Sequence, residues 1–161
     1  MKRYRLTIAA AAALLSLAAS FLLIASCGTS GDKKEGDKLP LIATQEELDS
    51  AGARAGTQMV VLDLYADWCG PCRILAPTLH ELAGEFKGKA AFYRINVDRS
   101  TDLARSFGVK GIPYVIFMME KRPVYALTGL NPKENYQKVL TICSGALSAD
   151  DCVNLLNEKM N

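Results

Sequence analysis

Residues 60–72 have the sequence VVLDLYADWCGPC, in which two cysteines follow directly on an apolar run. It begins with an apolar run, ends on the pair Cys69 and Cys72, and is followed directly by a helical pattern of apolar residues. A C-x-x-C pair alone is also compatible with half of a zinc site or with a short structural disulfide. Its position between a predicted buried strand and the start of a predicted helix favours a redox-active dithiol.

The chemistry of such a dithiol follows from its place at the N-terminus of a helix. Backbone N–H groups of the first turn have no partner within the helix, and the helix dipole is positive at this end. Both effects favour the thiolate of Cys69, which we expect to attack a substrate disulfide. Cys72 lies one turn further along and would resolve the mixed disulfide. Pro71 suits the first helical turn and Gly70 keeps bulk away from the attacking sulfur, so we expect both at the substrate-binding surface.

Residues 63–72, DLYADWCGPC, closely resemble the active-site segment of the thioredoxin family. The residues up to the first cysteine also resemble the C-terminal thiol domain of the disulfide interchange protein DsbD, in which different residues separate the two cysteines. The resemblance implies a thioredoxin fold, an α/β fold in which a central mixed β-sheet is flanked by helices. It also implies thiol:disulfide oxidoreductase activity on protein disulfides, with no cofactor and no metal.

Asp63 is an acid within an otherwise apolar predicted strand, and burial should raise its pKa by disfavouring the charged form. In the thioredoxin family an aspartate at the matching position is proposed to take and return the proton of the second cysteine, here Cys72. The alternative is an acid that backbone N–H groups satisfy at the end of a strand. Arg94 matches a lysine that many thioredoxins have near that aspartate. Its charge would moderate the pKa shift, although an arginine cannot exchange a proton as a lysine can.

The resemblance assigns substrate contacts to residues outside the dithiol. Gly111-Ile112-Pro113 resembles the cis-proline loop of the family, which would place Pro113 against the disulfide and the Ile112 backbone beside an extended substrate strand. Trp68 would flank the dithiol and form part of an apolar contact surface, the alternative being ordinary packing. Gly129 matches a family glycine that borders the substrate groove, the alternative being a role only in the turn to the last helix.

Hydrophobic patterning predicts alternating strands and helices through the middle of the chain. The first predicted strand is apolar on both faces, as expected for a strand between two layers of helices. Strand, helix and strand in succession indicate a parallel unit, and two later strands joined by a polar turn indicate a hairpin. The predicted helices are 45–53, 70–86, 101–107 and 131–142, and the predicted strands are 58–65, 90–97, 113–119 and 123–127.

Capping residues mark the expected starts of these helices. Residues 44–47 fit a capping box, and Ser100 is the expected cap of the third helix. In the last predicted helix, Asn131 is the expected N-cap and Pro132 the expected first residue. Pro77 lies inside the second helix and is predicted to kink it.

Residues 1–26 have the pattern of a secretory signal peptide, with a basic start, a long stretch rich in Ala and Leu, and small residues at the end. The segment LIASCG at residues 23–28 resembles the lipobox of bacterial lipoproteins, which implies cleavage before Cys27 and a lipid anchor on that cysteine. The alternative is an uncleaved transmembrane helix. Either way, a polar, glycine-containing tether within residues 27–40 would hold the domain at a membrane of the bacterial cell envelope, facing the periplasm or another extracytoplasmic space.

The family resemblance covers residues 41–142, and residues 143–161 form an extension that contains Cys143 and Cys152. In an oxidising compartment we expect a structural disulfide between these cysteines. Ser148 and the acids after it are expected to cap one more short helix, which the bridge would fold back. A regulatory or electron-relay pair is the alternative. A zinc site that combines both cysteine pairs is disfavoured, because the second spacing is not a usual ligand loop.

Composition limits the other function classes. The chain has 161 residues, half of them apolar, which suits one domain with a substantial core. The formal net charge is +2, and removal of the three positive charges of Lys2, Arg3 and Arg5 with the signal peptide leaves −1. With no basic patch that contains interleaved aromatic residues, the sequence gives no indication of nucleic-acid binding.

The sequence therefore predicts a monomeric, membrane-anchored thiol:disulfide oxidoreductase. The Gly-Pro pair between the cysteines resembles that of reducing thioredoxins, so we expect a protein-disulfide reductase, with electrons supplied by a membrane thiol relay of the DsbD kind. The enzymatic alternative is an oxidase or isomerase of secreted proteins. The non-enzymatic alternative is a binding module that keeps the fold without redox use.

Overall fold

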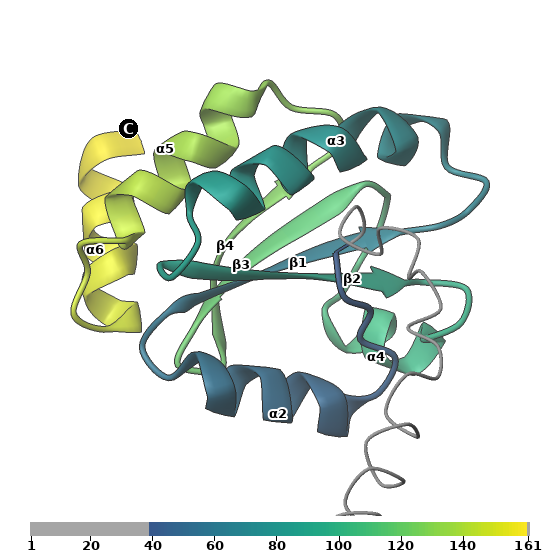
Figure 1. Ribbon diagram of the computed structural model, residues 1–161, viewed down its shortest axis with the longest axis horizontal. Coiled ribbons are helices and arrows are strands. Elements are labelled where there is room, and N and C mark those ends of the chain that lie inside the picture. Colours follow the sequence, from purple (N-terminus) through teal and green to yellow (C-terminus); the bar gives the residue numbers. More distant parts are fainter. Residues whose placement is uncertain (1–38, 161) are drawn as a thin grey trace, which may run out of the picture. The chain divides into compact units, whose positions relative to one another are not determined.

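The computed structural model describes residues 39–160. The predicted signal peptide, Cys27 and residues 28–38 of the tether lie outside the described residues. No helix within residues 39–160 is long and apolar enough to cross a membrane. The described elements, labelled as in Figure 1, are α2 (Gln45–Ala55), β1 (Met59–Tyr65), α3 (Gly70–Glu85), β2 (Ala90–Asn96), α4 (Thr101–Ser106), β3 (Tyr114–Met119), β4 (Arg122–Thr128), α5 (Lys133–Cys143) and α6 (Ala149–Met160).

The four strands form one mixed sheet in the order β2-β1-β3-β4. Strands β1 and β2 are parallel and are joined through α3, whereas β3 pairs antiparallel with both β1 and β4. A parallel connection of this kind needs a crossover, and α3 provides it. The predicted central mixed sheet with a terminal hairpin is therefore confirmed.

Helices cover both faces of the sheet (Figure 1), and each face has its own apolar core. Helices α3, α5 and α6 pack on one face, where Val61, Leu79, Tyr136 and Leu156 are members of the core cluster. Helices α2 and α4 pack on the other, around residues such as Leu62. Burial of β1 on both faces agrees with its nearly continuous apolar sequence.

The helix starts confirm part of the predicted capping. The capping box of α2 is complete, since the Glu47 backbone N–H donates to the Thr44 hydroxyl over 3.2 Å and the Thr44 N–H donates to the Glu47 carboxylate. Ser100 occupies the N-cap position of α4, but its side chain makes no capping hydrogen bond. Helix α3 continues through Pro77, and the kink predicted there stays a prediction.

The predicted start of the last helix was wrong by one residue. Pro132 is the N-cap of α5, and the helix begins at Lys133. Asn131 instead donates its side-chain amide to the carbonyl oxygens of Thr128 and Gly129, over 3.0 and 3.2 Å. These bonds close the turn after β4, and the Oδ1 atom of Asn131 accepts from the Asn135 side chain over 3.4 Å instead of from a backbone N–H of the helix.

The C-terminal extension contains a helix, α6, whose first turns are tied to the domain. A disulfide joins Cys143, at the end of α5, to Cys152, in the first half of α6, and both cysteines are buried. The start of α6 is held on the β3–β4 turn, where Arg122 pairs with Asp150 over 3.0 Å and Glu120 accepts the Ala149 N–H over 3.2 Å. The predicted short helix is thus twelve residues long.

The second disulfide lies at the end of the sheet opposite to the dithiol. The β3–β4 turn follows Met118, which pairs with Val60 near the start of β1. Cys69 comes after Tyr65, the last residue of β1. Because β1 has seven residues at roughly 3.3 Å each, about 20 Å of strand separates its two ends. Direct thiol exchange between the two disulfides is therefore excluded in this arrangement.

Replacing both Cys143 and Cys152 with Ala should lower stability without slowing catalysis. The disulfide closes a short loop, since nine positions separate Cys143 from Cys152. Its loss is expected to reduce the free energy of unfolding by about 2–4 kcal/mol. Denaturant unfolding and insulin-disulfide reduction would be measured on the same preparation. Normal stability together with a large loss of turnover would contradict the structural role and favour an electron relay.

Candidate active site

Cys69 and Cys72 form a disulfide at the N-terminus of α3, with 5.3 Å between their Cα atoms. Cys69 is the N-cap residue, and its Sγ accepts the backbone N–H of Cys72 over 3.1 Å. Gly70 and Pro71 form the start of the helix, as predicted. The Cys72 N–H and the positive end of the helix dipole are therefore directed at the Cys69 sulfur and would stabilise its thiolate after reduction.

Both sulfurs are shielded in the oxidised protein, with Cys69 3% and Cys72 1% exposed. The two cysteines form a small cluster with Ala66, against which Tyr65 and Ile112 pack. A substrate disulfide must therefore approach along the protein surface until it meets Cys69. Cys72, one turn inside the helix, is the better shielded of the two, which agrees with its predicted resolving role.

Asp63 lies in the middle of the sheet and is 1% exposed. Its Oδ2 atom accepts a hydrogen bond from Arg94 Nε over 2.8 Å, and the two residues face each other in the β1–β2 register. Its Oδ1 atom has no hydrogen-bond partner among the described residues. Burial raises the pKa of the Asp63 carboxyl, and the charge and hydrogen bond of Arg94 reduce that rise. The predicted direction of the shift is confirmed.

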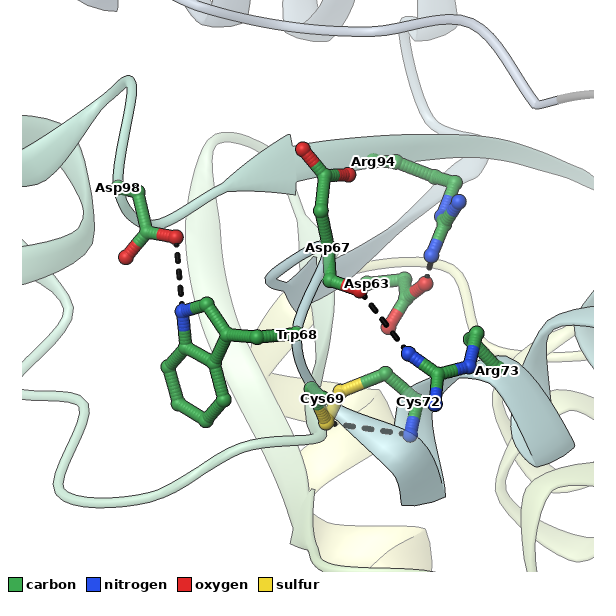
Figure 2. The surroundings of a disulfide bond; sticks show 8 residues. All are labelled: Asp63, Asp67, Trp68, Cys69, Cys72, Arg73, Arg94 and Asp98. Carbon is green, nitrogen blue, oxygen red and sulfur yellow. Dashed lines mark hydrogen bonds and ion pairs between the residues drawn. A yellow bond between two sulfur atoms is a disulfide. The ribbon is translucent and has the colours of Figure 1, made fainter.

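The Arg94 guanidinium is fixed from two sides. Its Cζ atom lies 3.5 Å from the centroid of the Tyr65 ring, a cation–π contact, while Nε binds Asp63. The Arg94 side chain is only 17% exposed, so water screens this ion pair weakly. The sequence indicated that Arg94 lies near Asp63 but assigned no role to Tyr65 in holding it. Figure 2 shows the carboxylate of Asp63 directed at Arg94, behind the disulfide.

A cavity of about 410 Å³ opens on the inner side of the dithiol. It reaches both Cys72 and Arg94, and Arg73 and His80 also line it. The Arg73 side chain donates to the backbone carbonyl of Asp67 over 3.0 Å, as drawn in Figure 2. His80 received no role from the sequence, because its contact with this cavity depends on how α3 packs on the sheet. The cavity thus reaches Cys72 and Arg94, the hydrogen-bond partner of Asp63, from one side.

The proline loop lies against the dithiol. The Ile112–Pro113 peptide bond is cis, and Ile112 packs on the cluster that contains both active-site cysteines. The Gly129 N–H donates to the Pro113 carbonyl oxygen over 2.8 Å. Gly129 has a φ of 77°, a conformation that favours glycine, so its identity is explained by the turn after β4. Its role in substrate binding, like that of the Ile112 backbone, stays a prediction.

Trp68 is 68% exposed, and its indole Nε1 donates to the Asp98 carboxylate over 2.9 Å (Figure 2). Together with Ile112, Gly111 and Val109 it lines a surface groove of about 340 Å³. Trp68 is therefore not a residue of the buried core, and its role in substrate contact stays a prediction. The groove borders the dithiol through Trp68 and Ile112, and polar Thr101 and Arg105 also line it.

Replacing Asp63 with Asn should produce a stability difference that depends on pH. A carboxyl whose pKa is raised in the folded protein favours folding below its ordinary value of 3.8, and this contribution is lost as the pH rises through the folded-state pKa. Asn does not titrate, so the free energy of unfolding of the variant minus that of the wild type should increase as the pH rises above 3.8 and then level off.

Denaturant titrations over a series of pH values would measure this difference. The unpaired Arg94 of the variant adds an offset that does not change with pH, because an arginine stays protonated throughout the range. A difference that is constant across the series, or one that decreases as the pH rises, would show that burial does not raise the Asp63 pKa.

Comparisons with known proteins agree with this geometry. The family model described as thioredoxin matches residues 41–141. A thioredoxin of Staphylococcus aureus is 39% identical over 97 residues, which are 60% of this chain and 90% of that protein. A thioredoxin of Staphylococcus haemolyticus is 41% identical over 87 residues, 54% of this chain and 82% of that protein.

Solved structures that are similar to this chain are also thioredoxins. A mutant thioredoxin of Halobacterium salinarum aligns with a TM-score of 0.61 and 28% identity, over 72% of this chain and 99% of that one. The thioredoxin of Fasciola hepatica aligns with a TM-score of 0.60 and 27% identity, over 64% of this chain and 97% of that one. With a Cys69–Cys72 disulfide at the matching helix start, the chain is a member of the thioredoxin family.

Proposed function

We propose that the protein is a membrane-anchored protein-disulfide reductase that acts outside the cytoplasm through Cys69 and Cys72. The observation that supports this most directly is the position of the dithiol, between the N-terminus of α3 and the buried carboxylate of Asp63. The helix end favours the thiolate of the attacking cysteine, and the carboxylate provides a proton acceptor for the resolving one.

The reaction proceeds in two exchanges. The Cys69 thiolate attacks one sulfur of the substrate disulfide, so a mixed disulfide forms and the other substrate sulfur leaves as a thiolate. Cys72 then gives its proton to the Asp63 carboxylate, and its sulfur attacks the Cys69 sulfur. The bond between Cys69 and the substrate breaks, and the second substrate sulfur leaves with the electron pair. Asp63 then releases the proton to solvent, the substrate thiolates take up protons from solvent, and the protein ends as the Cys69–Cys72 disulfide.

The groove beside the dithiol suits a protein substrate. Trp68 forms one apolar wall and Ile112 another. An extended substrate strand placed along the proline loop would form hydrogen bonds with the Ile112 backbone, as in β-augmentation. Gly70 adds little bulk beside Cys69, because it has no side chain. These contacts favour an extended, disulfide-containing segment over a small-molecule disulfide.

The reducing direction rests on the residues between the cysteines and on the relatives. Gly70 and Pro71 resemble the pair found in reducing thioredoxins, and the similar proteins of both staphylococci are thioredoxins. After each turnover the Cys69–Cys72 disulfide must be reduced again. We propose that a membrane thiol relay of the DsbD kind supplies these electrons, since the sequence before Cys69 resembles the thiol domain of that protein.

Anchoring rests on the N-terminal sequence alone. Residues 1–26 have the pattern of a secretory signal peptide, and the segment around Cys27 resembles a lipobox. A lipid on Cys27 would hold the domain at the membrane surface, with residues 28–38 as a tether. The reductase would then meet its protein substrates and its electron donor in the cell envelope.

Replacing each active-site cysteine separately tests the catalytic proposal. Cys69→Ser should abolish insulin-disulfide reduction, because the attacking thiolate is lost. Cys72→Ser should keep the attack but block resolution, so the protein should accumulate as a mixed disulfide with its substrate. Non-reducing electrophoresis and mass spectrometry would detect that adduct, and addition of dithiothreitol should release it.

The two variants should differ in their products: Cys69→Ser should form no adduct, and Cys72→Ser should accumulate one. Two outcomes would contradict the roles given to the two cysteines. Insulin reduction at the wild-type rate by Cys69→Ser would exclude the dithiol mechanism. An adduct that forms with Cys69→Ser but not with Cys72→Ser would reverse the roles of the two cysteines.

The anchoring proposal predicts the mass of the protein extracted from membranes. The chain should begin at Cys27 and should be heavier than the peptide alone by the mass of its acyl groups. Intact-mass spectrometry after detergent extraction would measure this. A chain that still begins at Met1 would show instead that the N-terminal segment is retained, as in an uncleaved transmembrane helix.

A further inference from the structure

Three buried side-chain polar atoms lack a hydrogen-bond partner among residues 39–160: Nδ2 of Asn96, at the end of β2, and two atoms in the layer between the sheet and helices α3 and α5. One is Oδ1 of Asp63 and the other is the hydroxyl oxygen of Tyr136, a residue that is 0% exposed. Buried polar groups in folded proteins are nearly always hydrogen bonded, because an unpaired one costs its full desolvation energy. Two such atoms in one core therefore require an explanation.

The sheet register directs both side chains to the same face. Side chains alternate along a strand, and Val61, two residues before Asp63, belongs to the core cluster that contains Tyr136. Leu62 belongs to the cluster on the opposite face. Val115, which pairs with Asp63 in the β1–β3 register, is also in the cluster of Tyr136. Asp63 thus points toward the layer in which Tyr136 is buried.

Tyr136 also lies toward the dithiol end of that layer. It is in the first turns of α5, which follows β4 and the turn at Gly129. Gly129 is bonded to Pro113, and Thr128 pairs with Tyr114 at the end of β3 nearest the dithiol. The start of α5 therefore lies at the same end of the sheet as Asp63 and the active-site cysteines.

The phenol is suited to donate a hydrogen bond at this place. Burial raises the Tyr136 pKa, the backbone and side-chain N–H groups of Asn131, which lie near the hydroxyl without forming a hydrogen bond of good geometry, lower it, and the negative charge of Asp63 raises it. The hydroxyl therefore keeps its proton at neutral pH. A phenylalanine would fill the same volume without bringing a polar atom into the core, so packing alone does not account for a tyrosine here.

We propose that Tyr136 is a positioning residue of the dithiol site, whose hydroxyl is linked to Oδ1 of Asp63 through one bound water that it hydrogen bonds. Arg94 already binds Oδ2, so both carboxylate oxygens would then be satisfied. Hydrogen bonds to the charged form favour that form, so the carboxylate stays ionised and ready to accept a proton.

The consequence for catalysis rests on the proposed function, in which Asp63 accepts the Cys72 proton during resolution. The groups around Asp63 are Arg94 from β2, Cys72 from α3 and Tyr136 from α5, while β3 contributes the apolar Val115. Without the hydroxyl, Asp63 would hold its proton to a higher pH. Resolution would then slow at acidic pH and proceed normally at alkaline pH.

The test is Tyr136→Phe, which deletes the hydroxyl and keeps the ring. Two measurements are made on the reduced protein: the titration midpoint of the Asp63 carboxyl by ¹³C NMR, and the single-turnover rate of oxidation by a peptide disulfide across a pH series. We expect the midpoint to move to higher pH and the rate at acidic pH to fall about tenfold, the effect of one hydrogen bond to a charged group.

Three controls accompany this variant. Tyr125→Phe deletes a half-buried hydroxyl on β4 and should leave both measurements unchanged. Arg94→Gln removes the known partner of Asp63 and should move the midpoint in the same direction as Tyr136→Phe. In the Asp63→Asn background, Tyr136→Phe should have no further effect on the pH profile, because the acceptor is gone.

An Asp63 midpoint and pH profile that Tyr136→Phe leaves unchanged would overturn the proposal. An equal effect of Tyr136→Phe with and without Asp63 would also overturn it, since the hydroxyl would then act on something else. Failure of the proposed function has a different signature. A wild-type protein that reduces no disulfide at any pH would overturn the reductase mechanism, while the NMR midpoint would still report the contact with Tyr136.

Discussion

The active site depends on one costly feature, the burial of the Asp63 carboxylate behind the dithiol. A charge in this position is unfavourable unless hydrogen bonds and an opposite charge compensate for it. Arg94 provides part of that compensation, and the ring of Tyr65 holds the guanidinium in place. The compensation is incomplete, because the pKa of the carboxyl is still raised. That imbalance suits a group that must accept a proton from Cys72 and later return it.

The two ends of the sheet have separate tasks. At one end, β1 leads into the dithiol, and the proline loop before β3 packs against it. At the other end, the β3–β4 turn holds the start of α6, and the disulfide between Cys143 and Cys152 fixes that helix to α5. The Cys143–Cys152 disulfide thus stabilises the end of the sheet far from Cys69 and Cys72 and does not restrict the reacting sulfurs. The second disulfide can strengthen the domain in an oxidising compartment while the first is reduced and reformed.

Much of the site was predictable because it lies in short continuous motifs. Cys69 follows a strand and opens a helix, and Asp63 interrupts an apolar strand, so both were identified from local sequence. What the sequence did not reveal depends on packing between distant segments. The stacking of Tyr65 on Arg94 needs the β1–β2 register, and the burial of the Tyr136 hydroxyl needs the position of α5 on the sheet. The cap of α5 was misplaced because the Asn131 side chain bonds the turn behind it.

A helix-terminal dithiol beside a buried acid should act as a reductant. The equilibrium reduction potential of the Cys69–Cys72 pair, measured by thiol alkylation across a series of dithiothreitol or glutathione buffers, decides this. For a reductant we expect a value near that of thioredoxin, about −270 mV. A value near or above about −180 mV, the range of disulfide isomerases and oxidants, would contradict it and would make the protein a donor or exchanger of disulfides.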